Sequence, residues 1–168
     1  MIAEFPYPMV ETEWLAAHYP GEGRIKVIDG SARLPGAEES AFSAYQRRHI
    51  PGAVFFDIDD IADKSSLLPH MLPFPDFFAA SVGALGVSAD DRVVIYDDAG
   101  LFSAARVWWT FRAMGHRDVA VLNGGLPKWL AEGRATTADL PAIEPTQYVT
   151  GPSQVEISNA DDVRRALK

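Results

Sequence analysis

The hydrophobic pattern of the chain has two recurring components. One is a short, largely apolar run with the length and the β-branched or aromatic content of a strand, at residues 25–28, 54–56, 93–96 and 119–122. The other is a longer segment with apolar residues at helical spacing, at residues 11–19, 42–45, 76–85, 103–114 and 126–132. Strands that alternate with helices predict an α/β fold, in which helices flank a central parallel sheet on both faces.

The run at residues 93–96 is apolar throughout, which predicts a central strand buried on both faces. It is followed by Asp97 and Asp98, and the run at residues 25–28 is followed by Asp29. In parallel α/β sheets, ligands bind at the carboxyl ends of strands, where loops meet the N-termini of helices. Any site of this fold is therefore expected at this edge of the sheet, with Asp97 at its entrance.

The boundaries of the domain are marked by local signals. Thr12 is the expected N-cap of the first helix, and the proline-rich segment 57–75 predicts a surface excursion. The domain is expected over residues 1–150, and its end overlaps an extended Thr/Pro/Ala-rich connector at 134–157. A Ser-Asn N-cap signal then opens a helix at 158–168, which is expected either to begin a second domain of the same kind or to dock on its own domain.

The composition limits the classes of function. The 168 residues are 48% hydrophobic, which suits one domain with a sizeable core. The net charge of -8 opposes binding to nucleic acid and to anionic membranes, so neither is expected as a partner. The chain has no cysteine, which excludes a disulfide, a thiolate nucleophile and a cysteine-ligated zinc site within it. No apolar run approaches the length of a membrane span, and a cytoplasmic location is the default expectation.

Two other kinds of site can be weighed from residue types alone. Asp29, Asp97 and Asp98 could ligate Mg²⁺, which prefers oxygen ligands, but the Lys or Thr partners of phosphoryl-transfer sites are missing. The simpler interpretation is that these carboxylates cap turns and helix starts. His49 enters a turn and is expected to be a hydrogen-bonding brace rather than an acid or base. The remaining histidines have no metal-ligand spacing, so no metal site is expected at His18, His70 or His116.

Several short motifs together resemble the landmarks of the rhodanese family. They are Tyr45-x-x-x-His49-Ile50-Pro51-Gly52-Ala53-x-x-Phe56, Gly115-His116, Asn123-Gly124-Gly125 and Trp129-x-x-Glu132-Gly133. Two more narrow the resemblance to the first domain of tandem sulfurtransferases of the thiosulfate and 3-mercaptopyruvate type: Leu68-Pro69-His70-Met71-Leu72-Pro73 and Arg106-Val107-Trp108-Trp109. The resemblance extends from Met9 to Val149. The Gly124-Gly125 pair is too short for a dinucleotide fingerprint and is interpreted as a turn.

The resemblance implies sulfur transfer by a parent protein rather than by this domain. In that family, a cysteine persulfide in the second domain carries sulfur from 3-mercaptopyruvate or thiosulfate to a thiol or cyanide, and no cofactor is expected. The family's cysteine follows the strand at the position where Asp97 follows Tyr96 here. The loop is therefore expected to be degenerate over Asp97-Asp98-Ala99-Gly100-Leu101-Phe102, and the expected partner is a second rhodanese-like domain of the same protein. The alternative is a free-standing, catalytically inactive domain that acts as an interaction module.

The aspartate has a chemical consequence that does not depend on the family. A thiolate takes up sulfane sulfur and is stabilised by the N–H groups of a loop, whereas a carboxylate cannot be thiolated. Asp97 is expected to accept hydrogen bonds from those N–H groups and to keep the loop ordered.

The helix expected after this loop has two apolar faces. The larger face should pack on the sheet and comprises Ala104, Val107, Trp108, Phe111 and Met114. The second lies between Arg106 and Arg112 and comprises Ala105, Trp109 and Ala113. It is expected to be covered either by helices of the same domain or by the second domain.

Overall fold

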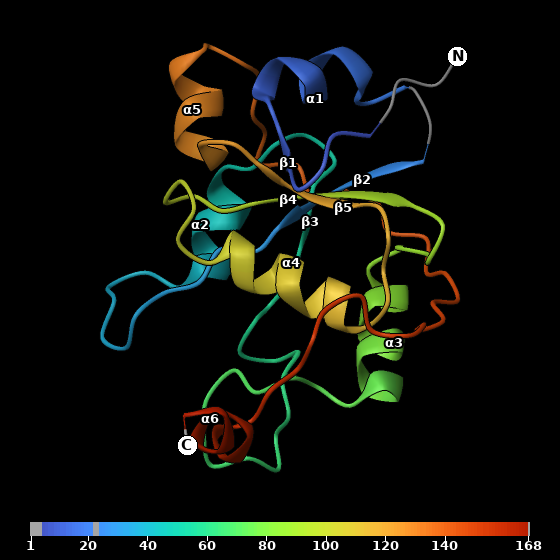
Figure 1. Ribbon diagram of the computed structural model, residues 1–168. Coiled ribbons are helices and arrows are strands. Elements are labelled where there is room, and N and C mark those ends of the chain that lie inside the picture. The colour runs from blue at the N-terminus through green and yellow to red at the C-terminus, as the bar shows by residue number, and fades with distance from the viewer. Residues whose placement is uncertain (1–4, 22–23, 168) are drawn as a thin grey trace.

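The computed structural model describes residues 5–21 and 24–167 of the chain. The described strands form one parallel sheet in the order β1-β5-β4-β2-β3. Their bounds are Met9–Val10 (β1), Ile25–Asp29 (β2), Val54–Phe55 (β3), Arg92–Tyr96 (β4) and Val119–Leu122 (β5). β4 lies in the middle between β2 and β5, so the apolar run at 93–96 is central as predicted (Figure 1).

Helices cover both faces of this sheet, which confirms the predicted α/β class (Figure 1). They are α1 (Thr12–His18), α2 (Ala41–Arg47), α3 (Pro75–Ala84), α4 (Ala104–Ala113), α5 (Gly125–Ala131) and α6 (Ala160–Ala166). Phe78 of α3 and Phe111 of α4 belong to the core on one face. Leu15 of α1 and Trp129 of α5 belong to the core on the other. None of the helices in the described residues is long and apolar enough to cross a membrane.

The amino-terminal end of the domain differs from its sequence-based prediction. β1 has two residues and pairs with β5, and no hydrophobic run marks it in the sequence. The N-cap of α1 is Glu11, whereas Thr12 is the first helical residue and is fully buried. The Thr12 hydroxyl donates to the Glu132 carboxylate at 2.8 Å. Thr12 therefore ties α1 to the end of α5, and its prediction as an N-cap was wrong.

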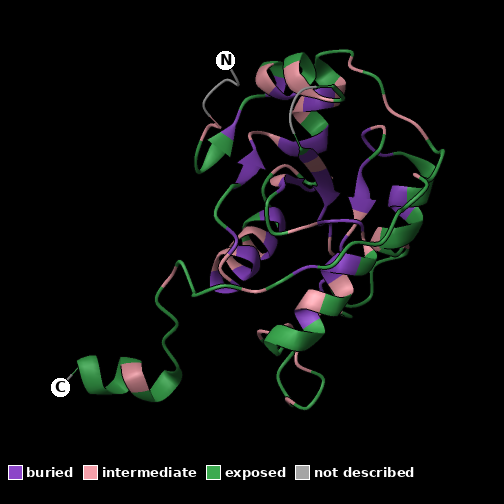
Figure 2. Cartoon of the chain, turned by 90° about the vertical axis from the view of Figure 1, so that its right-hand side faces the viewer, coloured by how far each residue is buried: buried purple, intermediate pink, exposed green. Residues whose placement is uncertain are grey.

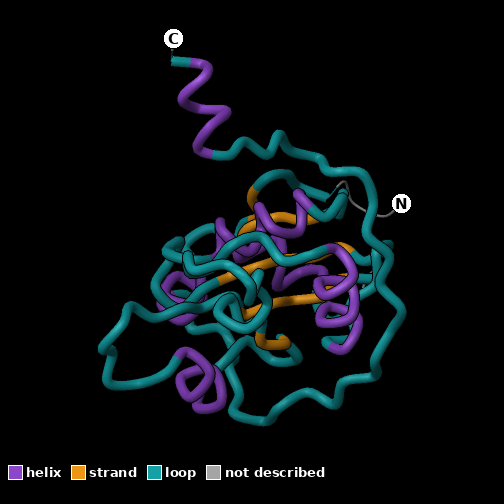
Figure 3. Tube along the Cα trace, turned by 90° about the horizontal axis from the view of Figure 1, so that it is seen from below, coloured by secondary structure: helices purple, strands orange, loops and turns teal. Residues whose placement is uncertain are grey.

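The extended connector lies against the domain for much of its length. Tyr148 is buried, with its ring centroid 5.5 Å from that of Phe78 and 5.9 Å from that of His116. The Gly151 amide then donates to the Met114 carbonyl at 3.0 Å. Beyond it, α6 has no buried residue and stands away from the rest of the chain (Figures 2 and 3). The structure thus does not show the docking that was one of the two expectations for this helix. That it begins a second domain stays a prediction.

Candidate functional site

The Asp97 carboxylate lies at the carboxyl end of β4 and is almost completely buried. One oxygen accepts hydrogen bonds from the amides of Ala99 (3.1 Å) and Leu101 (3.0 Å). The other accepts from the amides of Ser103 and Ala104, both at 2.8 Å. The hydrogen bonds expected for Asp97 are therefore present, and together they close the loop from 97 to 104 around one side chain.

The position of this carboxylate follows from the helix that comes after it. The first amides of a helix have no partner within the helix, and the positive end of the helix dipole favours an anion there. α4 begins at Ala104, and the side chain of its N-cap, Ser103, caps no amide of the helix. The Ser103 hydroxyl instead donates to the Gly30 carbonyl at 2.7 Å, across to the end of β2. Asp97 thus supplies the acceptor that the N-cap does not.

The loop is also fixed to α5 through close backbone contact. The Leu126 amide donates to the Asp97 carbonyl at 2.9 Å. A Cβ on Gly125 would lie 2.5 Å from that same carbonyl oxygen, so this approach requires glycine. Gly124 and Gly125 both have positive φ, 75° and 53°, as a turn into a helix needs. The expected turn at Gly124-Gly125 therefore also holds the Asp97 loop against the start of α5.

The Asp98 carboxylate binds a side chain, whereas the Asp97 carboxylate binds backbone amides. Both terminal nitrogens of the Arg33 guanidinium bind its carboxylate, one at 2.8 Å. Its amide donates to the Ser31 hydroxyl at 3.0 Å. Arg33 and Asp98 are 65 residues apart in the sequence, which is why no motif indicated the pair.

Asp29 is buried at the end of β2, where its carboxylate accepts from the Ser31 amide at 2.9 Å. Burial raises the pKa of Asp29, and the hydrogen bonds from Ser31 oppose part of that rise. The three carboxylates considered for Mg²⁺ thus each have a different set of partners. Within the described residues, no three acidic or histidine side chains are grouped as metal ligands, so the geometry gives the magnesium alternative no support.

A cavity of about 370 Å³ opens beside the loop. Its lining includes Phe102 and Ser103 of the loop, Arg33, and His70 from the proline-rich excursion. Arg106 of α4 also lines it and has no acidic partner among the described residues. The cavity therefore presents the Arg106 guanidinium, which has no acidic partner among the described residues, together with the Phe102 ring. This arrangement suits a small anion or an anionic partner surface.

Arg106 organises this side of the cavity. It donates to the His70 carbonyl and lies over the Trp109 ring, 4.6 Å from the ring centroid. Burial lowers the pKa of Arg106. The His70 Nδ1 atom lies 3.2 Å from the Asp59 carboxylate. No signal in the sequence indicated that His70 lies close to Asp59, because both residues lie in an excursion without periodicity.

The two faces of α4 have different surroundings. Its larger apolar face packs on the sheet as predicted, and the Trp108 indole N–H donates to the Val119 carbonyl at 3.0 Å. On the other face, Ala105 is exposed and Ala113 is buried. Trp109 is half-buried, with Arg106 covering part of its ring. The second face is thus neither enclosed by helices of its own domain nor an open aromatic patch.

His49 has the contacts expected of a brace. It is fully buried, and its ring nitrogens lie 2.8 Å from the Tyr45 carbonyl and 3.2 Å from the Asp139 carbonyl. Its backbone pairs with Thr137 of the connector. Pro51 and Gly52, with a φ of 78° at Gly52, turn the chain toward β3. This motif therefore holds the connector on the domain rather than presenting a reactive ring.

The comparison with protein families agrees with this architecture. The family model described as "Rhodanese-like domain" matches residues 11–132. The chain belongs to the rhodanese family. This rhodanese-like chain is 49% identical over 126 residues to thiosulfate/3-mercaptopyruvate sulfurtransferase 1, mitochondrial, of Arabidopsis thaliana, covering 75% of the chain and 33% of the relative. It is 39% identical over 165 residues to human 3-mercaptopyruvate sulfurtransferase, covering 95% of the chain and 56% of the relative.

Among solved structures, the rhodanese-like chain is similar to SseA from Escherichia coli, which is described as a 3-mercaptopyruvate sulfotransferase. The TM-score is 0.86 at 35% sequence identity, and the match covers 95% of this chain and 62% of that one. The chain spans about a third to a half of the curated relatives first matched. Family and fold together make it a sulfurtransferase-related domain that resembles the amino-terminal domain of tandem proteins. The cytoplasmic location stays a prediction, since the Arabidopsis relative is named as mitochondrial.

Proposed function

We propose that this chain is the non-catalytic amino-terminal domain of a sulfurtransferase. A second rhodanese-like domain would carry a cysteine persulfide and move sulfane sulfur from 3-mercaptopyruvate or thiosulfate to a thiol or cyanide. The observation that carries the proposal is the Asp97 loop. Four amides of the loop and the start of α4 donate to one carboxylate, in a chain without cysteine.

The chemistry of the loop supports a structural role. Loop amides at a helix start would lower the pKa of a thiolate and hold the anionic persulfide that it forms. In this chain four such amides donate to the Asp97 carboxylate, which cannot take up sulfur. The loop can therefore keep the shape of such a site without its reactivity.

The surface around the loop supports a second domain as the partner. Several large apolar side chains are exposed on the loop, on the proline-rich excursion and nearby: Leu34, Leu67, Leu68, Met71, Phe74, Leu101 and Phe102. Clustered apolar side chains with arginine nearby are typical of interfaces. Arg106 supplies that charge, and α6 extends away from the domain with no buried residue.

The proposal is tested by comparing the chain alone with the chain plus the cysteine-bearing half of a homologous sulfurtransferase. The chain alone should form no persulfide by mass spectrometry after incubation with thiosulfate or 3-mercaptopyruvate. Adding it to the cysteine-bearing half should raise turnover, and a Phe102→Asp variant should not. Sulfur found on the chain alone would overturn the proposal. A chain that binds other proteins but leaves turnover unchanged would favour the interaction module.

A further inference from the structure

The proline-rich excursion makes few hydrogen bonds to the rest of the domain. Residues 57–73 contain no helix or strand, and Ile58 and Ala62 bury their side chains in the domain. Among the described residues, every hydrogen bond of residues 57–73 joins two residues of the excursion, with one exception. The exception is the bond from the Arg106 guanidinium of α4 to the His70 carbonyl. Arg106 is therefore the only hydrogen-bonded tether that the described residues provide between this segment and the domain.

Residues 63–71 of the excursion form a closed loop, which we name the 63–71 loop. The Asp63 amide donates to the Met71 carbonyl at 3.0 Å and joins its two ends. Leu67 and Leu68, near the middle of the loop, are exposed. His70 lies beside the closing bond, so Arg106 holds the loop at its base.

The backbone of His70 has a conformation that needs support. Its φ is 56°, in the left-handed region that residues other than glycine rarely adopt. Such a backbone persists where surrounding contacts hold it. The carbonyl that Arg106 binds belongs to this residue, and the next carbonyl, that of Met71, closes the loop. Loss of the Arg106 bond would therefore act directly on the closing bond.

The Arg106 side chain is itself held in place for this contact. Its guanidinium lies over the Trp109 ring, 4.6 Å from the ring centroid, and the residue is half-buried. Stacking on an aromatic face fixes the plane of a guanidinium, and a charged donor makes a stronger hydrogen bond than a neutral one. Arg106 has no acidic partner among the described residues, so no carboxylate competes for its donors. Helix α4 thus presents a fixed donor to the loop.

We infer that Arg106 is a positioning residue, which holds the 63–71 loop ready to dock on the cysteine-bearing rhodanese-like domain. The inference rests on the proposed function, which supplies this partner. The chain covers 56% of the human relative, so a large part of that relative lies outside the match. Exposed leucines on the loop suit an apolar surface of such a domain. A loop that is already ordered loses less conformational entropy on docking, and Arg106 supplies that order.

The first test is hydrogen exchange by mass spectrometry on the chain alone. Arg106→Met keeps a long, unbranched side chain on α4 but removes the donor, so the amides of the 63–71 loop should exchange at least about fivefold faster. Arg106→Lys keeps a charged donor and should restore most of the protection. Arg33→Gln is the matched control and should leave the loop unchanged, because Arg33 lines the same cavity but binds Asp98 and no residue of the excursion.

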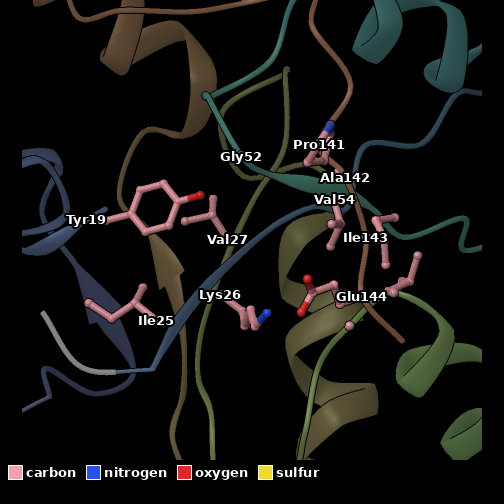
Figure 4. Close-up of a pocket in the computed structure, with 12 residues that line it drawn as sticks. Tyr19, Ile25, Lys26, Val27, Gly52, Val54, Pro141, Ala142, Ile143 and Glu144 are labelled. Carbon is pink, nitrogen blue, oxygen red and sulfur yellow. The ribbon is translucent and has the colours of Figure 1, made fainter. Parts of the chain in front are cut away.

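Two other segments show whether the change is local. The amides of β4 lie at the centre of the sheet and report on opening of the whole domain. Residues 142–144 line a separate cavity of about 320 Å³ between β2 and the connector, and no residue of α4 or of the excursion lines that cavity (Figure 4). Exchange at both segments should be the same in Arg106→Met as in the wild type.

The second test measures docking. The chain is titrated into the cysteine-bearing half of a homologous sulfurtransferase, and turnover is followed with thiosulfate. Arg106→Met should raise the half-saturating concentration of the chain at least about fivefold and leave the maximal turnover unchanged. Leu68→Asp should raise that concentration without faster exchange in the loop, because it alters the docking surface and not the tether. A purely structural role of Arg106 would change the exchange rates and not the half-saturating concentration.

The inference is overturned if Arg106→Met leaves the exchange of the 63–71 loop unchanged, or if exchange rises while the half-saturating concentration stays the same. Should Arg106→Met fail to fold, Trp109→Leu removes the ring that holds the guanidinium and should make the loop exchange at least about twofold faster. Unchanged exchange in that variant would overturn the inference as well. A wild-type chain that leaves turnover unchanged would overturn the proposed function and, with it, the docking. The exchange rates, measured without a partner, tell the two failures apart.

Discussion

The substitution Asp97→Ala removes the shared acceptor of four backbone hydrogen bonds. Two of the donors, the amides of Ser103 and Ala104, are in buried hydrogen bonds, whereas those of Ala99 and Leu101 are only partly buried. A buried donor left without an acceptor costs about 1–3 kcal/mol, and a partly buried donor can turn to water. We therefore expect Asp97→Ala to lower the free energy of unfolding by about 4 kcal/mol. This exceeds the roughly 0.5–2 kcal/mol typical of a single N-cap, because Asp97 accepts four bonds rather than one.

The measurement is urea unfolding at neutral pH, followed by tryptophan fluorescence. Asp98→Ala is the matched control, since it removes the adjacent carboxylate and its partly exposed pair with Arg33, worth about 1 kcal/mol or less. Asp97→Asn should be nearly as harmful as Asp97→Ala, because its amide group would place N–H donors against N–H donors. If Asp97→Ala costs no more than Asp98→Ala, the loop is not held by this carboxylate and the reasoning fails.

Four further outcomes are expected. Burial lowers the pKa of His116, so the unfolded chain takes up a proton that the folded chain resists. Unfolding free energy should therefore fall as the pH drops below about 6.5, and His116→Gln should flatten that slope in urea titrations. Deleting residues 158–168 should change the unfolding free energy by less than about 0.5 kcal/mol, because α6 has no buried residue; a larger loss in the same assay would show that α6 docks. Trp109→Ser should cost about 2 kcal/mol, less than a fully buried aromatic, with no change in self-association by sedimentation. Asp97→Cys should give a thiol with a pKa below about 8.5 by alkylation kinetics but little sulfur transfer, and full activity would contradict the proposed role of the loop.

The parts of the fold that could be predicted are those in which one local pattern decides the structure. The apolar run at 93–96 can be satisfied only by burial on both faces, so its central place in the sheet followed directly. The bonds of Asp97 were predictable for a similar reason, because the end of a strand, a short loop and a helix start all lie within a few residues. Local sequence contains all the groups that take part.

The missed features depend on residues that are far apart in the chain. β1 is two residues long, and only its pairing with β5 makes it a strand. The Arg33–Asp98 pair and the bond from Thr12 to Glu132 join positions separated by 65 and 120 residues. Such contacts arise from the way the elements pack, and neither periodicity nor motif spacing records them.

The connector determines how the domain would respond to mechanical force on its carboxyl-terminal end. Tension from α6 would first act on the bonds from Gln154 to Arg112 and from Gly151 to Met114, 2.9 and 3.0 Å long. The Tyr148 ring would have to leave the core next, before Thr146 and Thr137 came under strain. The contacts of the connector would therefore break one at a time, and the central strands would be the last part of the domain to carry the load.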